Sequence, residues 1–225
     1  MKAAPFEYRA PTSAPEVVTL LAELGDGAKV IAGGQSLVPM LALRLAVFDH
    51  LVDLRRVAGL GGIEPRDRSV WIGAGTTQAA IGRSGLVSAA VPLLARATPL
   101  IGHFQIRNRG TIGGSLAHAE AAAEYPAVAL ALGAVMHTLS PRGERAIPAT
   151  EFFTGIWTTA LEPDELLTGV LFPAWGGDGG RCGYAIEEFA RRPGDFAIAG
   201  AAVAVALSGD GGGRVARCGI ALLGL

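Results

Sequence analysis

The sequence predicts an α+β fold, with an α/β region followed by a smaller domain built on an antiparallel sheet. Up to about residue 160, short runs of apolar and β-branched residues alternate with stretches that have helical spacing. Beyond that point, four apolar runs follow one another without a helical pattern. We therefore expect a first domain over residues 1–160, divided into subdomains of about 1–55 and 56–160, and a second domain over 161–225.

The first helix is predicted over residues 13–24. Ser13 followed by Glu16 forms a capping box, apolar residues then recur at helical spacing, and Gly25 ends the helix. Short strands are expected at 29–31 and 50–54, with a turn and a short helix at 39–45 between them.

The remaining elements of the first domain have the same alternating character. Strands are expected at residues 70–73 and 135–139. Helices are expected at 77–83, 87–97 and 126–133, and Pro126 suits the start of the last one.

The second domain is predicted to contain four successive strands and no internal repeat. The strands are expected at residues 165–172, 181–190, 197–208 and 214–223. A flexible loop is expected at 175–180, and the glycine-rich segment 208–213 is expected to be a hairpin connector.

Composition excludes several classes of protein. The net charge of −1 argues against a nucleic-acid-binding surface. The N-terminus has no apolar signal segment, and the longest apolar run is far shorter than the ~20 residues of a membrane helix, so we expect a cytoplasmic protein without membrane contact. Cys182 and Cys218 form no CxxC or Cys/His ligand pattern, so no iron–sulfur cluster or zinc site is expected in this chain, and reduced thiols are favoured over a disulfide.

Two glycine segments are the most informative features of the chain. The first is Ala32-Gly33-Gly34-Gln35-Ser36, followed by the apolar Leu37, and the second is Thr111-Ile112-Gly113-Gly114-Ser115. Paired glycines let backbone N–H groups converge on an anion without interference from Cβ atoms. We expect the segments to form two sides of one cleft around a phosphate-rich cofactor, the alternative being tight bends without a ligand.

Neither segment is a standard nucleotide fingerprint. The chain has no GxxxxGK loop, and residues 73–78 begin like GxGxxG but lack the third glycine. His118 and Glu120 do not form an HExxH pair, so no metal site is expected. Glu120 and Glu124 are one helical turn apart, which is also the pattern of a solvated acidic helix face.

Four blocks of sequence resemble a known family in the order in which that family carries them. AGGQSLVPM at 32–40, with Arg44 just after, is similar to the first flavin motif of the FAD-binding medium subunits of molybdenum hydroxylases. IGAGTT at 72–77, RNRGTIGGS at 107–115 and RRPGDFA at 191–197 resemble the next blocks. Any single block is a weak signal, whereas four in order are a strong one.

The resemblance implies a vanillyl-alcohol-oxidase-type (PCMH-type) fold, in which two α/β subdomains clasp FAD and a small C-terminal domain follows. It implies non-covalent FAD, because no His or Cys attachment motif is present, with the pyrophosphate held by the backbone of both glycine segments. Ser115 stands where Asn or Asp is common. The resemblance also assigns cofactor-binding positions to Ala119, to Glu124 in place of a usual aspartate, and to Phe196, an aromatic over the isoalloxazine ring that equally suits a core residue.

The implied function is electron transfer within a molybdenum-containing hydroxylase or dehydrogenase. An iron–sulfur small subunit would deliver electrons from a molybdopterin large subunit to this FAD, and an acceptor would take them. No catalytic residue is assigned. The chain ends before the further helices of typical members, so the second domain is expected to be truncated, either in a piece of a longer protein or in a shorter relative. Self-association, a stand-alone FAD oxidoreductase and a scaffold without flavin remain alternatives.

Overall fold

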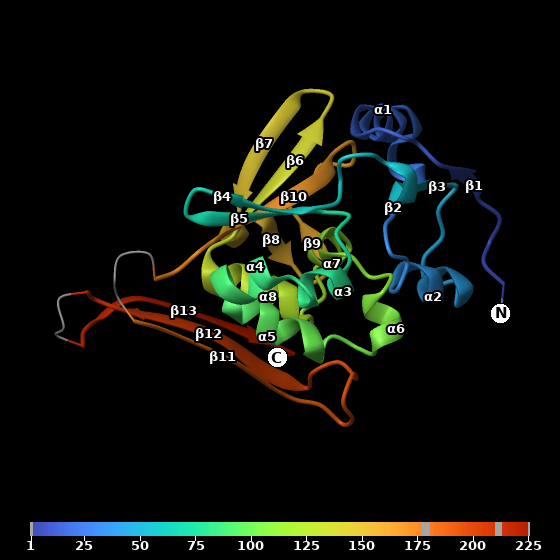
Figure 1. Ribbon diagram of the computed structural model, residues 1–225. Helices are drawn as coiled ribbons and strands as arrows, with labels where there is room; N and C mark the ends of the chain where they lie inside the picture. The colour runs from blue at the N-terminus through green and yellow to red at the C-terminus, as the bar shows by residue number, and fades with distance from the viewer. Residues whose placement is uncertain (1, 177–180, 210–212, 225) are drawn as a thin grey trace.

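The N-terminal part of the computed structural model is a helix packed on a small parallel sheet; the structure describes residues 2–176, 181–209 and 213–224. The sheet has the order β1-β3-β2, with β1 at Glu7–Arg9, β2 at Ala28–Ile31 and β3 at His50–Asp53. Helix α1 (Ala14–Leu24) begins at Ser13, whose hydroxyl accepts the Glu16 amide at 3.4 Å, and ends at Gly25 with φ of 57°. This unit lies at one end of the molecule (Figure 1).

The centre of the molecule is an antiparallel sheet with the order β4-β5-β10-β6-β7. Its strands are β4 (Ile63–Arg66), β5 (Ser69–Gly73), β10 (Leu166–Pro173), β6 (Val135–Ser140) and β7 (Gly143–Pro148). Strands β8 (Phe153–Gly155) and β9 (Thr158–Thr159) form a separate small hairpin.

Short helices surround the main hydrophobic core, and α4 (Gly85–Ala90), α7 (Ile112–His118), α8 (Glu124–Leu132) and α9 (Ala149–Phe152) contact this sheet directly. Helices α3 (Gln78–Gly82) and α5 (Pro92–Ala97) also contribute residues to the core. Helix α6 (Phe104–Arg107) contacts α3, and α2 (Leu37–Ala42) belongs to the N-terminal part. The single helix expected at 87–97 is two helices, α4 and α5. Pro92 has no amide hydrogen, and the chain bends at Val91, whose φ and ψ are −132° and 61°.

The C-terminal part is a three-stranded antiparallel sheet with the order β11-β12-β13. Its strands are β11 (Cys182–Phe189), β12 (Ala199–Leu207) and β13 (Val215–Leu223). Helices α5 and α8 cover one face of this sheet. The packing is close, because a Cβ on Gly219 would lie within van der Waals overlap of the Ala131 carbonyl. Cys182 and Cys218 are free thiols.

One strand lies in a different sheet from the one expected. The strand predicted at 165–172 is β10, which pairs with β5 on one side and β6 on the other, at the centre of the five-stranded sheet. It does not begin the C-terminal sheet, which has three strands among the described residues rather than four. The expected loop at 177–180 and the tip of the connector at 210–212 lie outside the described residues.

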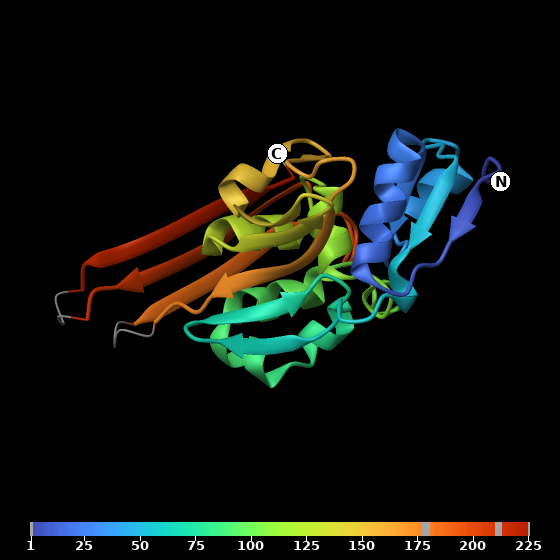
Figure 2. The same cartoon turned by 90° about the horizontal axis from the view of Figure 1, so that it is seen from above.

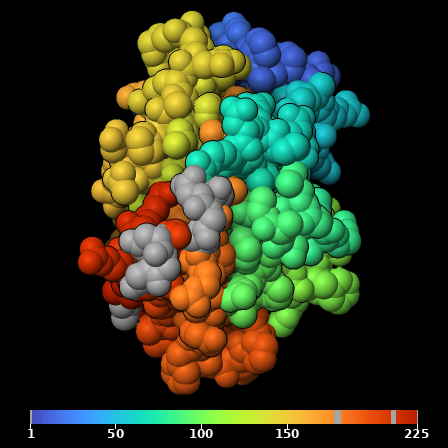
Figure 3. Space-filling model, turned by 60° about the vertical axis from the view of Figure 1, so that its left-hand side comes forward, coloured from blue at the N-terminus to red at the C-terminus, as the bar shows by residue number. Residues whose placement is uncertain are grey.

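The outer face of the C-terminal sheet carries apolar side chains exposed to solvent. Ile220 and Leu222 on β13 are 64% and 61% exposed, and β12 places Val203 beside Ile220. Figures 2 and 3 show this sheet (orange and red) at the side of the molecule away from α1 (blue). Within the described chain, no helix combines the length and the apolar composition that a bilayer crossing requires.

Candidate cofactor site

The two glycine segments meet in the folded chain. The stretch between β2 and α2 approaches the stretch between α6 and α7 (Figure 1). A Cβ added to Gly33 would overlap the Arg109 carbonyl oxygen and lie 2.8 Å from the Gly110 Cα, and a Cβ on Gly114 would lie 3.5 Å from the Ala32 Cβ. Only a residue without a side chain allows this approach at position 33.

The first segment presents backbone donors that no protein group uses. Among the described residues, no acceptor is found for the amide N–H groups of residues 33–37. Gly34 has φ of 72°, and the Gln35 side chain donates to the Gly33 carbonyl at 3.0 Å, which holds the turn in shape. Several free N–H groups in one turn before a helix form a concave anion-binding surface. The arrangement therefore fits a phosphate group.

The second segment is built differently, because its amides are occupied within the protein. The amides of residues 112–115 donate to Thr76 O, Ala74 O, Thr111 Oγ1 and Thr111 O at 2.9–3.1 Å. A Cβ on Gly113 would lie 2.5 Å from the Ala74 Cβ, so this glycine allows α7 to approach β5. The Thr111 hydroxyl accepts the Gly114 amide and keeps its own hydrogen to donate. This segment contributes close packing and one hydroxyl rather than a row of free amides.

Ala119 lies at the C-terminal end of α7 in a left-handed conformation with φ of 51°. Its carbonyl accepts the amide of Trp157, which lies at the tip of the β8–β9 hairpin, at 3.1 Å. The neighbouring Glu120 carboxylate accepts the Trp157 indole N–H at 2.6 Å. Ala119, which is one of the predicted cofactor-binding residues, is therefore hydrogen-bonded to the β8–β9 hairpin, a contact that the sequence did not predict.

Glu124 opens α8 and lies half-buried beneath the C-terminal sheet. Desolvation by burial raises its pKa to about 7, and the negative charge of Glu188 on β11 contributes to the rise. One oxygen of Glu188 is itself buried without a hydrogen-bond partner among the described residues. Glu124 therefore does not belong to a solvated acidic helix face, which was the alternative suggested by its spacing from Glu120.

The raised pKa of Glu124 predicts a loss of stability on going from pH 5 to pH 8. An acid whose folded pKa is raised stabilises the fold below its unfolded pKa of about 4.5, and that contribution disappears as the pH rises through about 7. The difference between these two pKa values sets an upper limit of roughly 3.5 kcal/mol for this contribution, and access of water to the carboxyl group reduces it. We expect Glu124→Gln to flatten the fall in melting temperature over this range. Glu23 is exposed, so the control variant Glu23→Gln should show the same fall in melting temperature between pH 5 and pH 8 as the wild type.

Other groups contribute to the same pH range, and their signs differ. Burial also raises the pKa of Glu188, which adds to the effect of Glu124. Burial lowers the pKa values of His118 and His137, so their contribution to the stability of the fold decreases as the pH falls, which is opposite in sign to the effect of Glu124. The difference between the wild-type and Glu124→Gln melting curves isolates the carboxyl group. An unchanged slope in Glu124→Gln would show that this residue does not titrate near pH 7.

Phe196 is 69% exposed, so the alternative that it is a buried core residue is wrong. Its segment connects β11 and β12 and packs against the segment before α6. A Cβ on Gly194 would lie 2.7 Å from the His103 ring. A cavity of about 560 Å³ lies here, lined by Pro99, Leu100, Gly102, His103, Phe104, Gln105, Arg107, Glu188, Pro193 and Gly194. Among the described residues, no hydrogen bond or ring contact joins Phe196 to either glycine segment.

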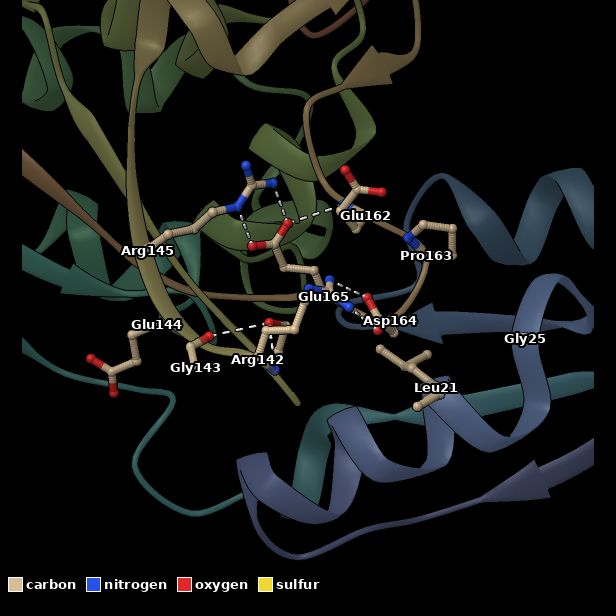
Figure 4. A pocket seen from close by; sticks show the side chains of 12 residues that line it. Leu21, Gly25, Arg142, Gly143, Glu144, Arg145, Glu162, Pro163, Asp164 and Glu165 are labelled. Atoms are coloured by element: carbon tan, nitrogen blue, oxygen red, sulfur yellow. Dashed lines mark hydrogen bonds and ion pairs between the residues drawn. The ribbon is translucent and has the colours of Figure 1, made fainter.

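A second cavity, of about 740 Å³, lies between α1 and the β6–β7 hairpin (Figure 4). Its wall contains Glu165, whose carboxylate receives two bonds of 2.6 Å from Arg145, and Asp164, which pairs with Arg142. The guanidinium groups are occupied by these carboxylates, and no predicted cofactor residue lines this cavity. Across the described ranges, no cluster of three or more metal-binding side chains is found.

Several residues that shape the site were not singled out from the sequence. Arg109 and Gly110 lie against Gly33, Ala74 lies against Gly113, and Trp157 lies against Ala119. The first three occur inside the sequence blocks at 72–77 and 107–115, so the blocks themselves were the available signal. Trp157 had no local signal, because its partners are far away in the sequence.

Comparison with known proteins gives a consistent result. Residues 4–175 match the family described as "FAD binding domain in molybdopterin dehydrogenase". The chain is 46% identical over 224 residues to the 6-hydroxypseudooxynicotine dehydrogenase complex subunit alpha of Paenarthrobacter nicotinovorans, covering 100% of this chain and 74% of that protein. It is 43% identical to the carbon monoxide dehydrogenase medium chain of Hydrogenophaga pseudoflava, covering 91% of this chain and 70% of that one.

Solved structures are similar over the whole chain. The carbon monoxide dehydrogenase from Hydrogenophaga pseudoflava superposes with a TM-score of 0.94 at 42% identity, covering 99% of this chain and 76% of that one. Quinoline 2-oxidoreductase from Pseudomonas putida 86 superposes with a TM-score of 0.91 at 40% identity, covering 100% and 75%. The fold is therefore that of these subunits, and this chain spans about three quarters of their length.

Proposed function

This chain belongs to the family of FAD-binding domains in molybdopterin dehydrogenases, and from that membership we propose that it holds FAD and relays electrons as the medium subunit of a molybdenum hydroxylase complex. Bound FAD would supply the redox chemistry, because it can exchange electrons singly or in pairs. The chain's own task is to bind and orient the cofactor. An iron–sulfur small subunit and a molybdopterin large subunit are its partners.

The single observation that supports cofactor binding most directly is the row of free amides at residues 33–37. These N–H groups would hold the pyrophosphate, with Gly33 pressed against the Arg109 carbonyl to set the turn. Thr111 would add its hydroxyl hydrogen. The full proposed cofactor-binding set comprises Ala32, Gly33, Gly34, Gln35, Ser36, Leu37, Thr111, Ile112, Gly113, Gly114, Ser115, Ala119, Glu124 and Phe196.

The division of the chain into domains follows from the same proposal. The FAD-binding domain comprises the N-terminal unit up to about residue 55 and the part that follows it. Because β10 pairs inside the five-stranded sheet, we place the start of the C-terminal domain after Pro173 rather than after residue 160. A cytoplasmic location also remains part of the proposal.

We expect the purified protein to be yellow and to release its flavin on denaturation. The chain offers no attachment motif, so acid precipitation should leave all flavin in the supernatant, where absorbance and chromatography identify it as FAD. Flavin retained in the precipitated chain would contradict non-covalent binding. A colourless protein that takes up no added FAD would contradict the proposed function.

Purification of the protein from its own host tests the assignment as a subunit. Native mass spectrometry should detect a complex that contains an iron–sulfur subunit and a molybdopterin subunit. A yellow protein that is active and free of partners would instead identify a stand-alone FAD oxidoreductase.

A further inference from the structure

Trp157 has a backbone conformation that bulky residues rarely adopt. It lies between β8 and β9 with φ of 54°, in the left-handed region where a large side chain is strained. The hairpin is anchored at its base by Phe152, which is fully buried and stacks edge to face on Phe153. Strain of this kind persists only where surrounding contacts determine it, and it is concentrated at binding sites.

Two hydrogen bonds determine the position of the indole. The Trp157 amide donates to the Ala119 carbonyl at 3.1 Å, and the indole N–H donates to the Glu120 carboxylate at 2.6 Å. Ala119 is itself left-handed, so two strained residues without glycine's freedom are joined to each other. The side chain is therefore held in one orientation before any ligand arrives.

Trp157 is nevertheless 63% exposed, so ordering by these hydrogen bonds does not bury the residue. The residues that hold it belong to the segment that links α7, which begins at the second glycine segment, to Glu124 at the start of α8. A rigid, exposed aromatic ring beside a dinucleotide site is suited to stacking on a planar ring.

We propose that Trp157 is a wall of the cofactor pocket and stacks on one of the planar rings of FAD. This inference rests on the proposed function, because it assumes that FAD occupies the site next to Ala119 and Glu124. The strained hairpin tip and its two hydrogen bonds hold the indole in one orientation, so little additional conformational entropy is lost when FAD binds.

The test is an FAD titration of the flavin-depleted full chain, followed by tryptophan emission and flavin fluorescence. Trp157→Asn keeps a residue that tolerates the left-handed region and removes the ring. Because stacking of a base on an aromatic side chain typically contributes a factor of about ten or more, we expect FAD affinity to fall about tenfold. Trp157→Phe keeps a ring and should lose about threefold or less.

Trp175→Phe is the matched control. Its indole N–H donates to the backbone carbonyl of Leu132, and the Arg217 guanidinium lies over its ring. This variant should bind FAD like the wild type and keep the FAD-dependent quenching of tryptophan emission, most of which should disappear in Trp157→Asn. Circular dichroism and melting curves should confirm that each variant is folded.

Three results would overturn the proposal, and they are distinguishable from failure of the proposed function. One is wild-type FAD affinity in folded Trp157→Asn. Another is unchanged FAD-dependent quenching in that variant. The third is normal FAD binding combined with loss of assembly with the partner subunits, which would assign Trp157 to a protein interface. If the wild type and Trp175→Phe also fail to bind FAD, the proposed function itself is wrong.

Discussion

Replacing Gly33 with alanine is expected to give a protein that binds no FAD and melts several degrees below the wild type. The new Cβ would overlap the Arg109 carbonyl oxygen and lie 2.8 Å from the Arg109 carbonyl carbon and from the Gly110 Cα. These are backbone atoms, so no side-chain rotation relieves the overlap and the two glycine segments must separate. Overpacking of this kind typically costs about 1–3 kcal/mol. Absorbance of bound flavin and thermal melting measure the two effects.

Variants at two other glycines distinguish an effect on FAD binding from an effect on the stability of the fold. Gly114→Ala brings a Cβ to 3.0 Å from Thr111 Oγ1, a side-chain atom that can shift, and to 3.5 Å from the Ala32 Cβ, so we expect a smaller loss of melting temperature than in Gly33→Ala, together with weakened FAD binding. Gly85→Ala, on the first turn of α4, meets no atom within 4 Å and should change neither property. Full FAD occupancy in Gly33→Ala would mean that the junction of the two segments is not the pyrophosphate site.

Replacing Arg145 with methionine is expected to destabilise the fold by about 3–5 kcal/mol, because it leaves a buried carboxylate without its counter-charge. The Glu165 side chain is 1% exposed and accepts Arg145 Nε and Nη2, Thr138 Oγ1 and the Glu162 amide at 2.5–3.0 Å. Desolvation by burial raises the pKa of Glu165, but these hydrogen bonds outweigh it and hold the pKa below its ordinary value. Urea unfolding at pH 7 measures the effect.

Arg142→Met is the matched control for this prediction. Its bidentate partner Asp164 lies in the same cavity wall, but the Arg142 side chain is 61% exposed, so the loss should be within about 1 kcal/mol. The stability that Glu165 provides should be present above pH 4.5 and disappear as the pH falls through its lowered pKa. Equal losses in the two arginine variants would show that burial does not distinguish the two ion pairs.

Local sequence signals predicted the elements whose causes are local. Ser13, the apolar spacing and Gly25 determine α1 within one short segment, and the strands at 29–31 and 135–139 lie within β2 and β6. The short edge strands β1, β4 and β7 were not predicted. Their side chains are mostly exposed, so they lack the apolar alternation by which a strand is identified.

The sequence by itself determined the family, because four ordered blocks retain the residues that the backbone and the cofactor require at each point. It also determined which glycines matter, since a position without a Cβ can be recognised wherever it stands in the chain. These are properties of short segments, and they hold before the chain folds.

Only the tertiary structure decided how those segments act together. It placed β10 between β5 and β6, brought Gly33 against Arg109, left the amides of residues 33–37 free while occupying those of 112–115, and tied Trp157 to Ala119. Each of these depends on contacts between residues far apart in the chain. Such contacts are selected by the packing of the whole core and the pairing of its strands, which no local pattern encodes.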